Sequence, residues 1–293
     1  MEEKAVYKKI ERERLDFYLA SVYKDYSRSY FQKLIRKKKI LVNNKVTSSS
    51  YRLEHGDVII FEFENEKRLL VEPESVKLDI LYEDTDIIVV NKPAGIVVHP
   101  ACGHLSGTLL NALVGYSKGD YKPYLMHRLD KDTSGVVISA KNEKTKANIL
   151  KQFQNREVRK IYYAAVKGAV IENRGKVEAP LSRSPQNRKL MTVNSLAKKM
   201  AITEFKTILR NDGYTLLKIR IITGRTHQIR SHMKYINHPV VGDQQYGGPK
   251  TINGRQFNRQ MLHSYSISFT HPETKNIVEF TAEMPIDMKR MLI

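Results

Sequence analysis

The sequence predicts an α+β protein in which a small α+β domain precedes a large domain with a mixed, mainly antiparallel sheet. Strand-like and helix-like segments are interspersed without the regular strand–helix–strand alternation that builds parallel sheets. With 293 residues, the chain is long enough for one large and one small hydrophobic core. A charged connector over residues 64–75 separates the two parts, so we predict domains over residues 11–72 and 77–293.

The small domain is expected to combine two short helices with a hairpin sheet. Residues 1–9 are expected to form a frayed tail. Leu15, Leu19 and Val22 have the spacing of one helix face, and Ser27 is a suitable N-cap for the next helix. An Asn-Asn turn and a Gly-Asp turn separate the apolar runs that follow. The expected elements are helices over 12–23 and 28–36 and strands within 40–46 and over 58–63.

The large domain is expected to alternate short apolar runs with amphipathic segments. Ala147, Leu150 and Phe153 form the apolar stripe of one of its helices. Gly224 interrupts the chain between a strand and the last long helix. The expected strands lie over 80–84, 87–91, 136–140, 159–166, 214–222, 261–269 and 277–282, and the helices over 108–114, 143–153 and 226–235.

The charge of the chain indicates a polyanionic partner. Fifty Lys and Arg residues against thirty-one Asp and Glu residues give a net charge of +19. The excess is clustered: residues 24–45 carry eight basic side chains against one acid, and residues 188–234 carry eleven against two. Phosphate is the usual partner for such clusters, so RNA is the expected ligand.

Other classes of protein are disfavoured by composition and spacing. Cys102 is the single cysteine, which excludes an intramolecular disulfide and a multi-cysteine zinc site. No apolar run is long enough for a membrane span, and no secretory leader is recognisable, so a cytoplasmic protein is expected. No histidine pair has the helical i,i+4 spacing of a metal site, and no Gly-rich phosphate loop is present.

The segment His127–Gly135 is the strongest candidate for a catalytic loop. It places charged residues and a Thr-Ser-Gly turn directly before the apolar run Val136–Ala140. Asp130 can act as nucleophile or general base if apolar neighbours and a cation set its charge state. An aspartate in such a loop is also commonly a solvated turn residue or a helix cap.

Four motifs give this loop a context. His-Arg-Leu-Asp-x-x-Thr-Ser-Gly over 127–135 resembles the catalytic loop of RluA/RluD-type pseudouridine synthases. Asn91-Lys-Pro-Ala-Gly-Ile-Val-Val-His-Pro100, Lys160-Ile-Tyr-Tyr-Ala-Ala-Val-Lys-Gly168 and Thr223-Gly-Arg-Thr-His-Gln-Ile-Arg230 resemble further motifs of that family, in the same order. The resemblance covers roughly residues 78–246 and implies the pseudouridine synthase fold.

The resemblance also implies roles for individual residues. Asp130 would be the catalytic aspartate and Arg225 its ion-pair partner. Only one of Tyr162 and Tyr163 can enter the pocket, because neighbouring strand residues point to opposite faces; the match to the family's motif assigns Tyr162 to the uracil ring. Arg128 would occupy the space left by a flipped uridine. His127 is expected to be a packed loop histidine bonded to backbone, and no cofactor or metal is implied.

The N-terminal segment resembles the alpha-L RNA-binding module that also occurs in ribosomal protein S-four. The matching residues are Ser27-Arg-Ser-Tyr-Phe-Gln-Lys-Leu-Ile35, Val42-Asn-Asn-Lys-Val46 and Gly56-Asp57. Phosphate contacts made by such a module are sequence-tolerant. The expected contacts are Arg28, Lys33, Arg36, Lys37 and Lys38; a solvated helix face is the alternative.

Together these patterns predict an RNA pseudouridine synthase, an isomerase that modifies RNA. The expected substrate is large-subunit rRNA or its precursor, with tRNA as the second choice. We expect a monomer without an obligate protein partner. The alternative is a non-catalytic RNA-binding or ribosome-assembly protein, which would have no need for Asp130, Tyr162 and Arg225 together.

Overall fold

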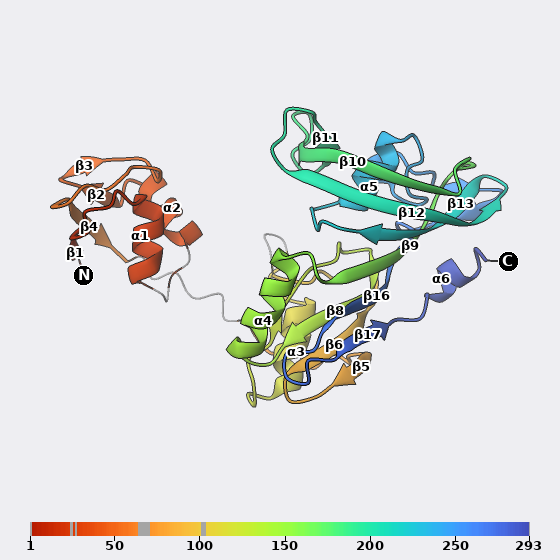
Figure 1. Cartoon of the computed structure of the whole chain (residues 1–293), viewed down its shortest axis with the longest axis horizontal. Coiled ribbons are helices and arrows are strands. Elements are labelled where there is room, and N and C mark those ends of the chain that lie inside the picture. The colour runs from red at the N-terminus through yellow and green to blue at the C-terminus, as the bar shows by residue number, and fades with distance from the viewer. Residues whose placement is uncertain (1, 24–25, 27, 64–70, 101–103, 293) are drawn as a thin grey trace. The chain divides into compact units, whose positions relative to one another are not determined.

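A computed structural model describes residues 2–23, 26, 28–63, 71–100 and 104–292, which form two compact units, Met1–Leu70 and Val71–Ile293 (Figure 1). The predicted N-cap Ser27, the single Cys102 and most of the predicted connector lie outside the described residues. None of the described helices is long and apolar enough to cross a membrane.

The N-terminal unit packs two helices on a four-stranded sheet with the order β1-β4-β2-β3. Its helices α1 and α2 carry Leu15, Leu19, Phe31 and Leu34 into a shared core. The elements are β1 (Glu2–Val6), α1 (Leu15–Val22), α2 (Arg28–Arg36), β2 (Ile40–Val42), β3 (Lys45–Val46) and β4 (Val58–Glu62).

The expectation of a frayed N-terminal tail is wrong. Strand β1 pairs antiparallel with β4, from Glu2 opposite Glu62 to Val6 opposite Val58. Tyr7 then anchors the strand, because it is fully buried and packs edge-on against Tyr18 at 4.9 Å between ring centroids. The unit therefore includes residues on the N-terminal side of residue 11.

The C-terminal unit is built on an 11-stranded sheet: nine strands follow the order β11-β10-β12-β13-β9-β16-β8-β6-β5, and β7 and β17 pair with β8 and β16 to complete it. All of its pairings are antiparallel except β16 with β8, which confirms the predicted α+β class with a mainly antiparallel sheet. The strands are β5 (Ile80–Glu83), β6 (Ile87–Lys92), β7 (Tyr124–Leu125), β8 (Ser134–Ala140), β9 (Arg159–Lys167), β10 (Arg174–Arg183), β11 (Met191–Val193), β12 (Met200–Asn211), β13 (Tyr214–Ile221), β16 (Leu262–Thr270) and β17 (Ile277–Thr281).

Helices cover the sheet at separate places (Figure 1). Helix α4 (Glu143–Gln154) lies against β8, and α5 (Gln228–Tyr235) lies against β10, β11 and β12. Figure 1 shows β9 between the part of the sheet that holds β10, β12 and β13 and the part that holds β16, β8 and β6. The smaller elements are α3 (Leu109–Ser117), the 3-10 turn η1 (Gln244–Tyr246), β14 (Thr251–Ile252), β15 (Arg255–Gln256) and α6 (Ile286–Lys289).

The long strands β10 and β12 were not predicted. Val177, Ala179 and Leu181 of β10 alternate with exposed or half-buried residues, so one face of the strand is buried. A glycine and a proline interrupt this alternation, at Gly175 and Pro180, and both are depleted in strands. These strands support α5, which carries part of the site described below.

The parallel contact between β8 and β16 is short and fixes the start of β8. Its register joins His263 to Ser134 and Ser264 to Gly135. Gly135 has a φ of 116°, and a Cβ placed on it would lie 2.1 Å from the Ser264 carbonyl oxygen. Only glycine allows this approach, and it positions the loop that precedes β8.

Candidate active site

The loop between β7 and β8 is anchored by apolar side chains and exposes a carboxylate. Met126 and Leu129 are 7% and 5% exposed and belong to two core clusters. A turn closes where the Thr133 amide donates to the Asp130 carbonyl at 3.1 Å. With its neighbours packed inward, Asp130 turns its carboxylate toward a cavity.

The back of this loop is held by groups from distant segments. The ammonium of Lys92, which is fully buried, donates to the carbonyls of Pro93, Ile96 and Lys131 at 2.7, 2.9 and 3.0 Å. The Gln260 amide donates to Thr133 Oγ1 at 2.6 Å. Because three carbonyls share one ammonium, Lys92 ties the loop after β6 to the loop that carries Asp130.

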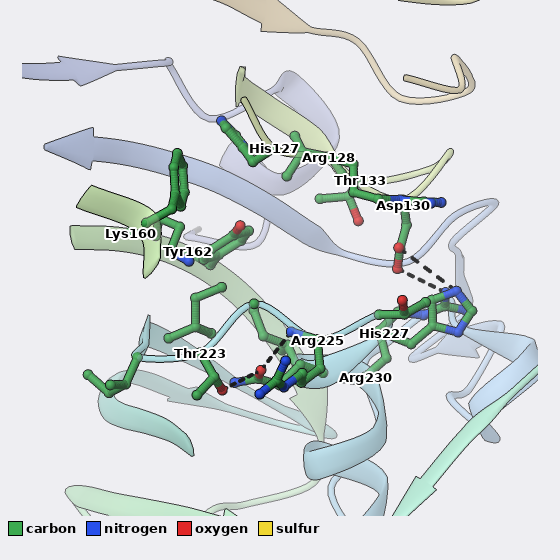
Figure 2. A pocket seen from close by; sticks show the side chains of 18 of the residues that line it. His127, Arg128, Asp130, Thr133, Lys160, Tyr162, Thr223, Arg225, His227 and Arg230 are labelled. Carbon is green, nitrogen blue, oxygen red and sulfur yellow. Dashed lines mark hydrogen bonds and ion pairs between the residues drawn. The ribbon is translucent and has the colours of Figure 1, made fainter. Parts of the chain in front are cut away.

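The cavity has a volume of about 500 Å³ (Figure 2). Its walls come from five places: the loop 126–133, the end of α4 and the residues after it, strand β9, the segment 221–230 that leads into α5, and Leu262 at the start of β16. Asp130, Tyr162, Arg128 and Arg225, all proposed from sequence, line it. The fold thus brings residues of three separate sequence motifs to one pocket.

Asp130 forms its ion pair with Arg230. The Nη1 atom of Arg230 donates to Asp130 Oδ2 at 3.1 Å (Figure 2). The rest of this guanidinium is held by Asp243, through bonds of 2.6 and 2.8 Å, and by Gln245 at 2.9 Å. The central guanidinium carbon of Arg230, Cζ, lies 4.7 Å from the ring centroid of Tyr246. Burial alone would lower the pKa of Arg230, but the carboxylates of Asp243 and Asp130 raise it above its usual value.

The expected ion pair between Asp130 and Arg225 is therefore wrong. Arg225 is exposed, and its Nε donates to the Met200 carbonyl at 3.3 Å. It lies in the turn that precedes α5, whereas Arg230 lies within the helix and faces the catalytic loop. A signal for Arg230 existed in the sequence: it stands between Ile229 and Met233, and a basic residue on a buried helix face needs a carboxylate partner.

Tyr162 forms one wall of the cavity. It is 6% exposed and pairs across the sheet with Ser264 and Ile219. Burial raises the pKa of its hydroxyl to about 12, against a hydrogen bond with Ser264 that lowers it. Tyr163 points to the opposite face, where its ring meets Tyr265 at 5.0 Å. Tyr162 therefore presents an uncharged aromatic ring to the pocket.

His127 and Arg128 differ in their surroundings. The Ile138 amide donates to His127 Nε2 at 3.2 Å, so this histidine is a packed residue bonded to backbone. Burial, with a contribution from the charge of Lys160, lowers the pKa of His127 to about 3, which keeps it neutral. Arg128 is exposed at the edge of the cavity. Only Arg128 of this pair is available to an incoming polyanion.

His227 is a site residue that the sequence patterns did not single out. It has a left-handed backbone with φ of 50° directly before α5, a conformation that costs energy for a non-glycine residue. The Met191 amide donates to the Tyr246 hydroxyl at 2.8 Å, and that hydroxyl lies 2.9 Å from His227 Nδ1. His227 Nε2 lies 3.8 Å from Asp130 Oδ1. The His227 ring thus lies between Tyr246 and Asp130, with one ring nitrogen facing each.

The basic residues proposed in the N-terminal unit fall into two groups. Arg28 donates to the buried Asp16 at 2.8 Å, and its guanidinium lies 3.9 Å from the Phe17 ring centroid. Burial would raise the pKa of Asp16, but hydrogen bonds from Arg14, Gln32 and Arg28 lower it to about 2. Exposed side chains at and after the end of α2 form the second group: Lys33, Arg36, Lys37 and Lys38.

Known proteins match both units of the chain. Residues 86–235 match the family model described as RNA pseudouridylate synthase, and residues 13–59 match the S4 domain. Within the described residues, no three His, Cys, Asp or Glu side chains are placed to hold a metal ion.

Similar proteins carry consistent names. The chain is 41% identical to the uncharacterized RNA pseudouridine synthase YlyB of Bacillus subtilis, over 96% of this chain and 93% of that protein. It is 38% identical to ribosomal large subunit pseudouridine synthase D of Escherichia coli, over 96% and 90%. The solved structure of human RNA pseudouridylate synthase domain containing 1 is 28% identical, with a TM-score of 0.58 over 72% of this chain and 86% of that one.

Proposed function

Because the chain belongs to the RNA pseudouridylate synthase family, we propose that it isomerises specific uridines of large-subunit rRNA or its precursor to pseudouridine. The observation that carries the proposed site is the Asp130–Arg230 ion pair at the edge of a cavity walled by Tyr162. The choice of rRNA is supported by relatives named ribosomal large subunit pseudouridine synthase D and by the net charge of +19. Structured tRNA is the second substrate class.

The isomerisation needs a catalytic group that assists cleavage of the glycosidic bond and the rotation of uracil in the pocket. The N1–C1′ bond of uridine breaks, the base rotates, and a C5–C1′ bond forms; C5 loses a proton and N1 gains one. The change is redox-neutral, so the proposal requires no cofactor. Asp130 is the proposed catalytic carboxylate, because Arg230 holds its Oδ2 while Oδ1 accepts no hydrogen bond from the described residues. In that position it can serve as nucleophile or as base.

The remaining pocket residues are assigned by position. Tyr162 is the proposed platform for the uracil ring, because it projects from β9 and lines the cavity. A uridine in a helix must first be flipped out, at a cost of a few kcal/mol. Arg128, exposed at the pocket edge, is proposed to offset that cost by entering the vacated space. Arg225 is proposed as a further RNA contact at the same edge.

The S4 domain is proposed to add sequence-tolerant affinity for RNA. Lys33, Arg36, Lys37 and Lys38 are exposed at the end of α2 and are the proposed phosphate contacts. Arg28 is proposed to act chiefly through Asp16, by fixing the start of α2 against α1. A monomer without an obligate protein partner is part of the proposal. An rRNA substrate further supports action in the cytoplasm.

The proposal is tested by a direct search for the product. Wild-type protein and Asp130→Asn are incubated with unmodified large-subunit rRNA and tRNA transcripts, and pseudouridine is mapped by position. We expect product in rRNA with the wild type only, and equal RNA binding by both proteins. Product confined to tRNA would reject the rRNA assignment, and product formed by Asp130→Asn would reject the assigned carboxylate.

A further inference from the structure

Lys160 is a buried cation in the catalytic pocket to which the proposed reaction assigns no role. It lies on β9, two residues before Tyr162, so both side chains point to the same face of the strand. Lys160 is 7% exposed, and it lines the cavity. Figure 2 shows it next to Tyr162, with Asp130, His227 and Arg230 gathered across the pocket.

The described part of the protein gives Lys160 no counter-charge. Its side chain forms no hydrogen bond or ion pair with any described residue, and its Nζ lies 5.5 Å from the ring centroid of Phe153. Burial lowers the pKa of Lys160 to about 8, and no carboxylate lies close enough to oppose that shift. His127, whose pKa the charge of Lys160 lowers further, is neutral.

The other two buried cations among the described residues of this unit, by contrast, have protein acceptors for their N–H donors. Lys92 donates to three backbone carbonyls, and Arg230 is bonded to Asp243 and Asp130. A buried charge without such partners lowers the stability of the fold. An uncompensated cation aimed into a cleft is typical of a site whose missing partner is the ligand.

The charge of the pocket indicates what that ligand carries. Its described lining holds five basic side chains, Arg128, Arg156, Lys160, Arg225 and Arg230, against one carboxylate, Asp130. Arg230 is already engaged by that carboxylate. Uracil is neutral, so it can offer Lys160 a carbonyl but no opposite charge. A phosphodiester offers both charge and acceptor oxygens.

We propose that Lys160 binds a phosphodiester of the RNA strand beside the flipped uridine, and so forms a phosphate subsite across the pocket from Asp130. Because its ammonium lies inside the pocket, phosphates of a helix docked on the surface do not reach it. Only the strand segment that enters together with the uridine does. The inference rests on the proposed function for its ligand, but its first test needs no turnover.

The first test observes Lys160 directly. The full chain is labelled with ¹³C at the ε carbon of lysine, and the Lys160 signal is identified by its loss in Lys160→Met. Uridine 5′-monophosphate, uridine 3′-monophosphate and uridine are added in turn. We expect a nucleotide to shift the signal and to raise the pH at which it titrates, whereas uridine does neither. The nucleotide that causes the larger shift shows whether Lys160 contacts the phosphate on the 5′ side or on the 3′ side of the flipped uridine.

Two results of this test would overturn the subsite. Equal shifts with uridine would mean that the base, not the phosphate, contacts Lys160. A visible Lys160 signal that neither nucleotide moves, at nucleotide concentrations that displace RNA from the protein, would exclude phosphate there. A nucleotide shift without pseudouridine formation in any RNA would retain the subsite and reject the proposed substrate.

The second test separates binding from chemistry. For Lys160→Met we expect KM for RNA to rise about tenfold with kcat within twofold, and the slope of log affinity against log salt to fall by about 0.7. Lys160→Arg should restore most of the affinity. Lys167→Met is the matched control, because Lys167 is exposed at the other end of β9 and outside the pocket lining. A loss in kcat at unchanged KM and salt slope would reject the phosphate role.

Discussion

The guanidinium of Arg230 lies 3.1 Å from the carboxylate of Asp130, although 100 residues separate them in sequence. The pair joins a loop before β8 to helix α5, which packs on β10, β11 and β12. Asp243 holds the other side of Arg230. The geometry of the carboxylate therefore depends on how the two parts of the sheet are joined through β9 and β16.

This relationship predicts different outcomes for the two arginines of one motif. Arg230→Lys keeps a positive charge but loses the planar fork that contacts Asp130, Asp243 and Gln245 together. We expect kcat to fall by roughly 100-fold or more, because the carboxylate is no longer fixed. Arg225 lies at the pocket edge and does not contact Asp130. Arg225→Lys should therefore lower kcat by less than about tenfold and mainly raise KM. Single-turnover rates on one rRNA transcript measure both, and a larger kcat loss for Arg225→Lys would contradict the assignment.

The sequence predicted the wrong ion-pair partner for Asp130, Arg225 in place of Arg230, because local patterns do not determine long-range contacts. Motif order and strand alternation located the loop with Asp130 and the strand with Tyr162, because both depend on local patterns. The helix was expected to start at Thr226, but it begins at Gln228 after the left-handed His227. Arg225 precedes the helix in either case; it was expected to pair with Asp130 because it lies at the break between strand and helix and because of the family resemblance, whereas Arg230 reaches the loop from a face of the helix. Asp243, the residue that orients Arg230, has no local signal at all.

Strands that are recognisable mainly by a distant pairing partner were also missed from the sequence. Charged residues interrupt both segments, at Glu204, Lys206 and Arg210 in β12 and over residues 2–4 in β1, so neither segment stands out as apolar. Strand β1 is recognisable only by its partner β4, more than fifty residues away. By contrast, β6 and β8 are apolar on both faces and were expected from composition alone.

Two buried lysines should respond oppositely to the same substitution. Lys92→Met leaves three backbone carbonyls without their donor, so we expect a loss of about 3 kcal/mol or more in the free energy of unfolding. Lys160→Met removes a charge without protein partners and should raise that free energy at pH 7. Urea denaturation of both variants measures the difference. A destabilised Lys160→Met protein would reveal a structural partner for Lys160.

The stabilisation by Lys160→Met should also depend on pH in a defined window. The pKa of Lys160 is about 8 in the folded protein against 10.5 for an ordinary lysine, so the folded state binds fewer protons between these values. Wild-type stability therefore rises, relative to the variant, as pH increases from 8 to about 10.5. The difference of up to roughly 3 kcal/mol at pH 7 should vanish at the top of that range. A constant difference across it would contradict a charged Lys160.

Gly135 should be intolerant of even a methyl group. Its φ of 116° disfavours any other residue, and a Cβ would meet the Ser264 carbonyl at 2.1 Å. We expect Gly135→Ala to lower both melting temperature and activity, because the start of β8 must move and shift the loop with Asp130. Gly168→Ala is the matched control: its φ is 73°, but a Cβ there would meet no atom within 4 Å. Gly168→Ala should lose only about 1–2 kcal/mol in the free energy of unfolding, from the left-handed backbone alone, and should retain kcat.

The two groups of basic residues in the S4 domain should separate stability from RNA affinity. Arg28→Ala removes a hydrogen bond to the buried Asp16. That carboxylate keeps Arg14 and Gln32, so we expect a loss of about 1–3 kcal/mol in the stability of this domain. Arg36→Ala and Lys38→Ala change exposed side chains and should leave stability within about 0.5 kcal/mol.

RNA affinity should respond to Arg36→Ala and Lys38→Ala more than to Arg28→Ala, the reverse of the expected effects on stability. Each of Arg36→Ala and Lys38→Ala is expected to reduce the salt slope of affinity by up to about 0.9, the value for one lost phosphate contact on duplex RNA treated like B-DNA. Arg28→Ala should leave that slope unchanged at temperatures where the domain stays folded, since its charge is already engaged by Asp16. Melting curves and filter binding at several salt concentrations make the comparison. A salt slope that falls with Arg28→Ala but not with Arg36→Ala would place the RNA on the α1 side of the domain instead of the end of α2.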